Sequence, residues 1–377
     1  MGLLRRGETS RKAALSVQSG RRDGFSLLQV LSPGPGERAL YRQLRENVPI
    51  IDAAIYKLRR LMGSFTVECD DPAAQEAVQE FLSHVQVGAT GCGADEFIGV
   101  YLEELLTYGT AVGEMVVSGG ELRALYNANL NDLELSEDGP LGVKIYAAGA
   151  GGKQECSYPE LLLVSALNPA AGSPWGTSLL RGLPFVSEIL LKIYQTLGVN
   201  WDRMGNVRFA VTCKPEGLGG FPAAERARQM AEEWRRAMRS PELSDFVAVG
   251  DVSIKAIGAD GQTMDSDIPV RQMLEQIVAK LGLPPFLLGL SWSSTERMSS
   301  QQADVLTSEL EAYRRLLTPV IRKIAVTYLT LNGYSARCRV EWDDITMQDE
   351  VDHANARYLT ARAREIEEKL QEKEDRE

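Results

Sequence analysis

The side chains that most often carry catalysis are scarce in this chain of 377 residues, which has only two histidines, His84 and His353. A proton relay or a zinc centre normally depends on imidazole groups that the fold brings together. We interpret each histidine as a residue on a helix face or at the surface, and we expect no histidine-based centre.

Two pairs of aspartates offer a different chemistry, because paired carboxylates hold Mg²⁺ in many nucleases. Asp265 and Asp267 come just before a predicted helix, where a carboxylate also favours the positive end of the helix dipole. Asp343 and Asp344 follow a predicted strand, where capping and turn-forming roles are common. These structural roles are our first interpretation. A carboxylate- and metal-dependent DNA-processing enzyme stays open as the alternative function.

Two short motifs come close to catalytic loops without matching them. Residues 149–153 read GAGGK, but Ala147 and Gln154 stand where a phosphate-binding loop needs Gly and Ser or Thr, so we expect a hairpin tip. Residues 289–293 read GLSWS, in which Ser293 replaces the closing glycine of a nucleophile elbow. We therefore predict no catalytic residue, no metal site and no cofactor.

The composition is that of an ordinary globular protein, with 44% hydrophobic and 25% charged residues. A net charge of −11 is opposite in sign to that expected of a protein that grips duplex DNA over its surface. The five cysteines are widely spaced and include no C-x-x-C pair, which favours reduced thiols over a disulfide framework. No apolar run approaches the ~20 residues that span a bilayer, so we expect a cytoplasmic protein without membrane contact.

The N-terminal half is predicted to be an α+β lobe behind a basic arm. Residues 1–36 are polar, basic and interrupted by Gly and Pro, which predicts a disordered arm. Over residues 37–183, helical apolar spacing alternates with short β-prone runs, which is typical of the α+β class. The predicted helices are 37–62 with a kink or a restart at Pro49, 72–84 and 95–108. The predicted strands are 65–69, 111–117, 122–126, 133–135, 143–147 and 161–164.

The C-terminal half is predicted to be built on long helices. The broad apolar stripe of a helix over 184–204 indicates packing on more than one side. Pro319 is expected to kink a long helix that begins near residue 300. The predicted order is helix 184–204, compact insert 205–268, helix 269–288, polar loop 289–299, long helix and strand 300–348, and a charged terminal helix 349–377.

Six segments, in the same order along the chain, resemble segments of tailed-bacteriophage portal proteins. They are 106–111 (LTYGTA), 175–180 (WGTSLL), 281–289 (LGLPPFLLG), 300–302 (SQQ), 317–319 (LTP) and 339–344 (RVEWDD). Each motif is short and mostly structural, so their order and spacing carry the resemblance. The fold that it implies is a portal-protein fold with an α/β wing, a two-helix stem, a small α/β clip, and a long kinked helix after an inward tunnel loop.

The resemblance also implies roles for the segments. Residues 37–183 and 300–348 would form the wing, 184–204 and 269–288 the stem, 205–268 the clip, 289–299 the tunnel loop, and 349–377 a short crown. The DNA-facing tunnel-loop residues would be Ser291, Trp292, Ser293, Ser294, Thr295, Glu296, Arg297 and Met298, with Trp292 contacting either DNA or a neighbouring subunit. The hinge residues of the stem and long helix would be Pro284, Pro285, Gly289 and Pro319. The clip residues that meet the terminase or connector would be Lys214, Glu216, Arg226, Arg235 and Asp245.

By this resemblance we expect a portal subunit of a phage or prophage: a ring of about twelve copies at one capsid vertex, through which DNA is packaged and ejected. Its expected partners are copies of itself, the large terminase subunit, a head–tail connector or adaptor, the major capsid and scaffold proteins, and double-stranded DNA that passes without sequence specificity. It would be assembled in the host bacterial cytoplasm, reside in the virion and have no enzymatic activity. A net-acidic wall suits such a channel, because each added cation would strengthen DNA binding and slow its passage. A ring-forming connector or scaffold other than the portal is a further alternative.

Overall fold

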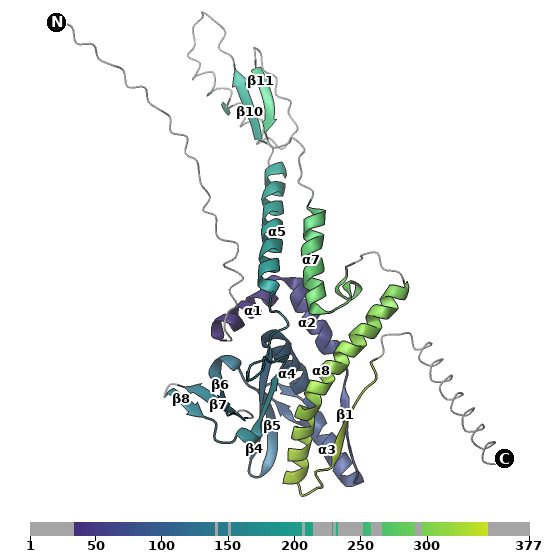
Figure 1. Cartoon of the computed structure of the whole chain (residues 1–377). Coiled ribbons are helices and arrows are strands. Elements are labelled where there is room, and N and C mark those ends of the chain that lie inside the picture. The colour runs from purple at the N-terminus through teal and green to yellow at the C-terminus, as the bar shows by residue number, and fades with distance from the viewer. Residues whose placement is uncertain are drawn as a thin grey trace, which may run out of the picture. The chain divides into compact units, whose positions relative to one another are not determined.

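The computed structural model describes residues 34–139, 142–149, 152–205, 208–213, 228, 231–232, 252–257, 266–290 and 296–345. The chain divides into two compact units (Figure 1). Unit 1 comprises Met1–Phe185 and Ile277–Glu377, and unit 2 comprises Val186–Gln276.

Three helices pack together in unit 1: α1 (Pro35–Asn47), α2 (Pro49–Leu61) and α4 (Ala94–Tyr108). Of the two alternatives predicted at Pro49, a kink or a restart, the structure shows the restart: α2 begins at this proline, whose missing N–H is no loss in a first helical turn. Helix α4 is apolar on most sides and buried along most of its length. The carboxylate of Glu103 on α4 pairs with Arg59 of α2 at 2.6 Å and with Arg45 of α1 at 3.4 Å, which ties the three helices together.

The main sheet of unit 1 has five strands in the order β3-β2-β5-β4-β9. They are β2 (Gln86–Val87), β3 (Gly91–Cys92), β4 (Thr110–Ser118), β5 (Glu121–Asn127) and β9 (Leu162–Ala166). Helix α4 packs on β4, where Phe97 lies so close to Gly113 that a Cβ there would come within 2.5 Å of its ring. The Tyr101 hydroxyl donates to the Ala111 carbonyl at 3.1 Å, so this buried polar group is satisfied.

A smaller sheet of three antiparallel strands follows: β6 (Leu133–Asp138), β7 (Gly142–Gly149) and β8 (Gly152–Glu155), flanked by the short helices η2 (Leu130–Asp132) and η3 (Pro159–Leu161). Leu130, Leu135 and Ile145 form a small core with Val112 of the main sheet. The predicted hairpin tip is confirmed, because Gly149 pairs with Gly152 across β7 and β8.

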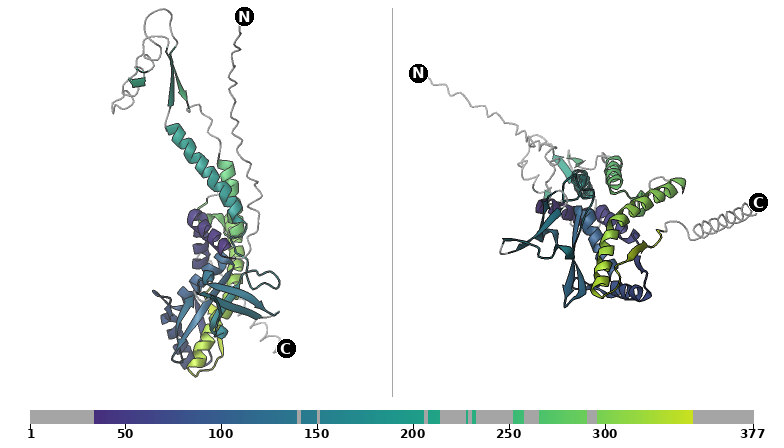
Figure 2. Two further views of the ribbon diagram at one scale, coloured as in Figure 1. Left: turned by 90° about the vertical axis from the view of Figure 1, so that its left-hand side faces the viewer. Right: turned by 60° about the horizontal axis from the view of Figure 1, so that its bottom comes forward.

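The N- and C-terminal parts of unit 1 meet where β1 (Phe65–Cys69) pairs antiparallel with β12 (Cys338–Trp342). Helix α3 (Pro72–His84) contacts β1, and the long helix α8 (Glu296–Leu331) contacts β12 (Figure 2). The sequence prediction started this helix near residue 300, and the structure corrects that start to Glu296. Pro319 lies inside the helix, and the Thr318 hydroxyl donates to the Arg314 carbonyl one turn earlier at 2.7 Å.

Four elements connect to or form unit 2: α5 (Leu183–Gly205), β10 (Arg208–Cys213), β11 (Val252–Ile257) and α7 (Asp267–Leu281). Strands β10 and β11 pair antiparallel, with Arg208 opposite Ile257. The short helix η4 (Pro285–Leu288) follows α7. Most of the predicted arm over 1–36 and the whole predicted terminal helix over 349–377 lie outside the described residues. The structure corrects the end of the arm, because helix α1 already begins at Pro35. In the part of the chain that is described, no helix is both long and apolar enough to cross a membrane.

Candidate assembly surface

Two segments that the sequence analysis selected separately, 106–111 and 175–180, contact each other in unit 1. The Ser178 hydroxyl donates to the Thr107 carbonyl at 2.6 Å, and both residues are buried. A buried hydrogen bond between such distant parts of the chain fixes the segment that leads into α5.

The two segments approach each other most closely at the backbones of Gly109 and Gly176. Gly109 ends α4 in the left-handed conformation, with φ of 81°, which favours glycine. A Cβ built on Gly176 would lie 1.9 Å from the Gly109 carbonyl oxygen, so no side chain fits at this position. The Gly176 N–H donates to the Thr110 hydroxyl at 2.9 Å, which orients the two segments.

The segment after α7 is held by its apolar residues. Leu283 and Pro284 are buried, and Gly289 ends η4 with φ of 75°. The Leu290 N–H donates to the Pro285 carbonyl at 3.1 Å, which closes the turn. Pro284, Pro285 and Gly289 therefore form a compact turn at the end of α7; their role as hinges stays a prediction.

Helix α5 changes in exposure along its length. Leu183 and Leu190, near its start, are buried. From residue 191 onward every described side chain is half-buried or exposed, although several are large and apolar. Tyr194 is 45% exposed and Trp201 is 68% exposed.

Three of the exposed apolar side chains of α5 lie on one broad side of the helix, and two others, Phe185 and Val199, lie away from it. Leu191, Tyr194 and Trp201 follow one another at spacings of three and seven residues, so they share a face, and the half-buried Ile193 and Leu197 lie next to it. Thr196 lies on the opposite side. Soluble proteins rarely expose such a cluster of large apolar residues without a partner, so this face, which we call the α5 apolar face, is a candidate assembly surface.

The remaining predicted site residues are only partly described. Ser291–Thr295 and the five predicted clip residues lie outside the described residues, and their roles stay predictions. Glu296, Arg297 and Met298 belong to the first turn of α8 and not to a loop, which shortens the predicted tunnel loop.

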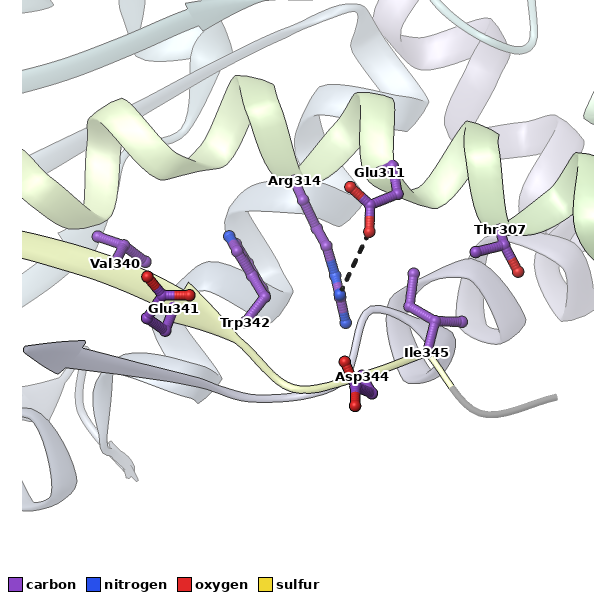
Figure 3. Close-up of a pocket in the computed structure, with 8 residues that line it drawn as sticks. All are labelled: Thr307, Glu311, Arg314, Val340, Glu341, Trp342, Asp344 and Ile345. Atoms are coloured by element: carbon purple, nitrogen blue, oxygen red, sulfur yellow. Dashed lines mark ion pairs between the residues drawn. The ribbon is translucent and has the colours of Figure 1, made fainter. Parts of the chain in front are cut away.

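The paired aspartates do not form a metal site in the described residues, where no group of three metal-ligating side chains occurs. Asp267 lies in the first turn of α7, as the helix-dipole interpretation predicts, and Asp265 is outside the described residues. Asp344 lines a pocket of about 450 Å³ between α8 and β12 (Figure 3). The Arg314 side chain extends into this pocket near Asp344, so a fixed guanidinium stands where a cation would have to bind.

Arg314 is the centre of a structural contact that sequence reasoning missed. It is only 5% exposed, donates through Nε and Nη2 to the Met62 carbonyl, and lies over the Trp342 ring at 5.1 Å. Burial lowers the pKa of its guanidinium from the ordinary value, while the nearby acidic residues oppose that shift. An arginine in an amphipathic helix normally faces solvent, so nothing in the sequence indicated that the Arg314 side chain is buried.

No protein-family model and no curated protein matches the chain. Several solved structures match the chain. A chain in a structure of the virion of a native gene transfer agent particle is 15% identical, with a TM-score of 0.64, and the match covers 88% of this chain and 90% of that one. A chain in a structure of the neck of the native particle, computed with C12 symmetry, is 16% identical, with a TM-score of 0.62, and the match covers 87% and 89%. An HK97 family phage portal protein from Corynebacterium diphtheriae is 10% identical with a TM-score of 0.43, and the match covers 83% and 96%.

The agreement with the gene transfer agent chains extends over nearly the whole length of both proteins, at an identity too low to indicate more than a shared fold. The chain therefore has the α+β fold of a protein found in the virion and the neck of a gene transfer agent particle.

Proposed function

We propose that this chain is the subunit of a phage-type portal, a closed ring of identical copies through which double-stranded DNA enters and leaves a capsid. The observation that carries the proposal is the α5 apolar face. It is built from large side chains at helical spacing, and it is exposed in the isolated chain. The partner that we propose for it is a second copy of the same chain.

A ring explains why this face is exposed over so many turns. In a closed ring each subunit uses one surface toward one neighbour and a different surface toward the other, so every copy can bury its apolar face. Burying one large apolar side chain at an interface stabilises it by about 1.5–3 kcal/mol. Several such residues on α5 would supply a substantial part of the association free energy.

Two further observations support a ring at a capsid vertex. The shared fold is with a chain of a particle neck whose structure was computed with C12 symmetry. The sequence segments that resemble portal proteins include the pair whose backbones meet at Gly109 and Gly176, which positions the start of α5. In this proposal α5 and α7 form the stem, residues 205–268 the clip that docks the terminase and the connector, and the region around 291–295 the loop that faces DNA.

The proposal assigns no enzymatic activity to the chain, and the virion is its proposed location. The Arg314 guanidinium beside Asp344 argues against a metal-dependent nuclease at the Asp343–Asp344 pair. The acidic balance of the chain, at −11 per copy, supports a channel wall along which a polyanion moves without being held.

Electron microscopy of the purified chain tests the proposal, with class averages viewed along the particle axis. We expect closed rings with a central hole and a symmetry near twelvefold. Tyr194→Lys should raise the protein concentration needed for ring formation by tenfold or more, since about 1.4 kcal/mol per interface corresponds to a factor of ten.

Thr196→Lys is the matched control, because it adds the same charge to the opposite side of the same helix. It should leave ring formation close to that of the unchanged chain. Monomers at every concentration and salt condition would contradict the proposal. Rings that fail to bind a terminase would instead favour a connector or scaffold other than the portal.

A further inference from the structure

Two of the five cysteines face each other across the ladder that joins the N- and C-terminal parts of unit 1. Cys69 is the last residue of β1, and Cys338 is the first residue of β12, the strand beside it (Figure 1). The two are direct partners in the antiparallel register. Both are free thiols in the structure.

The hydrogen-bond pattern places this pair at a position suited to a disulfide. The Asp343 N–H donates to the Ser64 carbonyl at 3.0 Å, so that pair is of the hydrogen-bonded type. Because the two types alternate along an antiparallel ladder, the Cys69–Cys338 pair is of the non-hydrogen-bonded type. The Cys69 N–H supports this assignment, since it donates to the Gln75 side chain and not to β12.

Non-hydrogen-bonded pairs bring opposite side chains closest together. Their Cα atoms are about 4.5 Å apart, within the range of about 4.4–6.8 Å found in disulfides. Phe65 and Trp342, at an equivalent pair of the same ladder, have ring centroids 5.4 Å apart. Phe65, Val67 and Cys69 alternate with exposed residues, so the cysteines lie on the same side of the ladder as this aromatic contact.

We propose that Cys69 and Cys338 form a site of oxidative modification, at which a small disulfide such as glutathione disulfide closes an intrachain bridge. One cysteine thiolate attacks the small disulfide, forms a mixed disulfide and releases one glutathione. The second cysteine then attacks the cysteine sulfur of the mixed disulfide and releases the other glutathione. The two thiol protons end on the two released glutathione molecules, and the two electrons lost by the cysteines reduce the small disulfide.

The surroundings of the two thiols keep the reaction slow in a reducing compartment. Burial raises the pKa of the Cys69 thiol, and the neighbouring Cys338 and two acidic residues raise it further. Burial also raises the pKa of the Cys338 thiol, whereas the positive charge of Arg322 lowers this pKa to a smaller extent. Fewer thiolates at neutral pH mean a slower attack on an oxidant.

The bridge would fasten the first residue of β12, a few residues after the end of α8, to the last residue of β1. If the chain is a virion component, which rests on the proposed function, this fastening would occur after the particle leaves the reducing cytoplasm. The bridge itself does not depend on that function.

The test is peptide mapping of the full chain after incubation with excess glutathione disulfide. We expect a linked pair of peptides containing Cys69 and Cys338, lighter by two hydrogens than the reduced pair, and a melting temperature several degrees higher that falls again on reduction. Cys92→Ser removes an exposed thiol outside the pair and should leave both results unchanged. Cys69→Ser should abolish both and leave a stable glutathione adduct on Cys338.

Separate glutathione adducts on Cys69 and Cys338 of the folded chain, with no linked peptides, would overturn the proposal. Linkage of either cysteine to Cys92 would do the same. Circular dichroism of Cys69→Ser under reducing conditions checks that this variant folds, and Cys338→Ser provides the reciprocal variant. Because the assay needs no ring and no particle, its outcome is independent of the portal proposal.

Discussion

At the scale of single residues, Arg314 connects three parts of unit 1 through one guanidinium group. It donates to the Met62 carbonyl beyond the end of α2 at 3.1 and 2.6 Å. Its own carbonyl accepts from Thr318, whose hydroxyl oxygen in turn accepts from the Trp342 indole at 3.0 Å. This chain of contacts joins α2, α8 and β12 beside Pro319, where the helix backbone has lost one donor.

We predict that Arg314→Met lowers the free energy of unfolding by about 2–3 kcal/mol, because the buried Met62 carbonyl loses both of its donors. Arg315→Met is the matched control, since Arg315 is an exposed neighbour on the same helix and its replacement should cost less than about 0.5 kcal/mol. Urea unfolding followed by circular dichroism measures both values. Equal effects of the two substitutions would contradict the assigned role of Arg314.

At the scale of secondary-structure elements, the contact between Gly109 and Gly176 holds the segment that leads into α5 against the end of α4. We predict that Gly176→Ala destabilises unit 1 by more than about 3 kcal/mol, because its Cβ would collide with backbone that cannot move aside. Gly36→Ala is the control: Gly36 lies in α1 with open space around its Cβ position, and alanine favours helices. Thermal melts of both variants provide the comparison, and a Gly176→Ala protein as stable as the unchanged chain would contradict it.

The elements that could be predicted from the sequence are those whose pattern is local. Strand β1 and helix α3 have the predicted bounds. Apolar and polar residues alternate along the whole of β1, and apolar residues recur every three or four positions along the whole of α3, so each pattern is complete within its own segment. Strands β2, β3 and β8 were missed, because they have only two to four residues and depend on their partner strands. The broad apolar stripe of α5 was predictable, whereas the burial of Arg314 depends on residues more than 250 positions away in the sequence.

At the scale of the whole molecule, the chain leaves and re-enters unit 1 once, through α5 and α7. The buried residues of the described core belong mainly to unit 1, and β1 pairs with β12 from the far end of the chain. Unit 1 therefore closes its own core from both parts of the sequence. Several large apolar side chains of α5, in contrast, are exposed in the single chain, so in the proposed ring unit 2 would depend on other copies more than unit 1 does.

This division of roles can be tested by deleting Val186–Gln276 and joining Phe185 to Ile277 through a flexible Gly/Ser linker of about ten residues. We predict that the shortened chain still unfolds cooperatively, because β1, β12, α4 and α8 retain their mutual contacts. It should also remain monomeric in sedimentation experiments at concentrations where the full chain is expected to form rings, because it lacks the α5 apolar face. A shortened chain that forms rings would place the main subunit contact in unit 1 and not on α5. A shortened chain that unfolds without cooperativity would show that unit 1 depends on unit 2 for its stability. The flexible linker lets Phe185 and Ile277 keep their positions, so strain at the junction would not explain such a result.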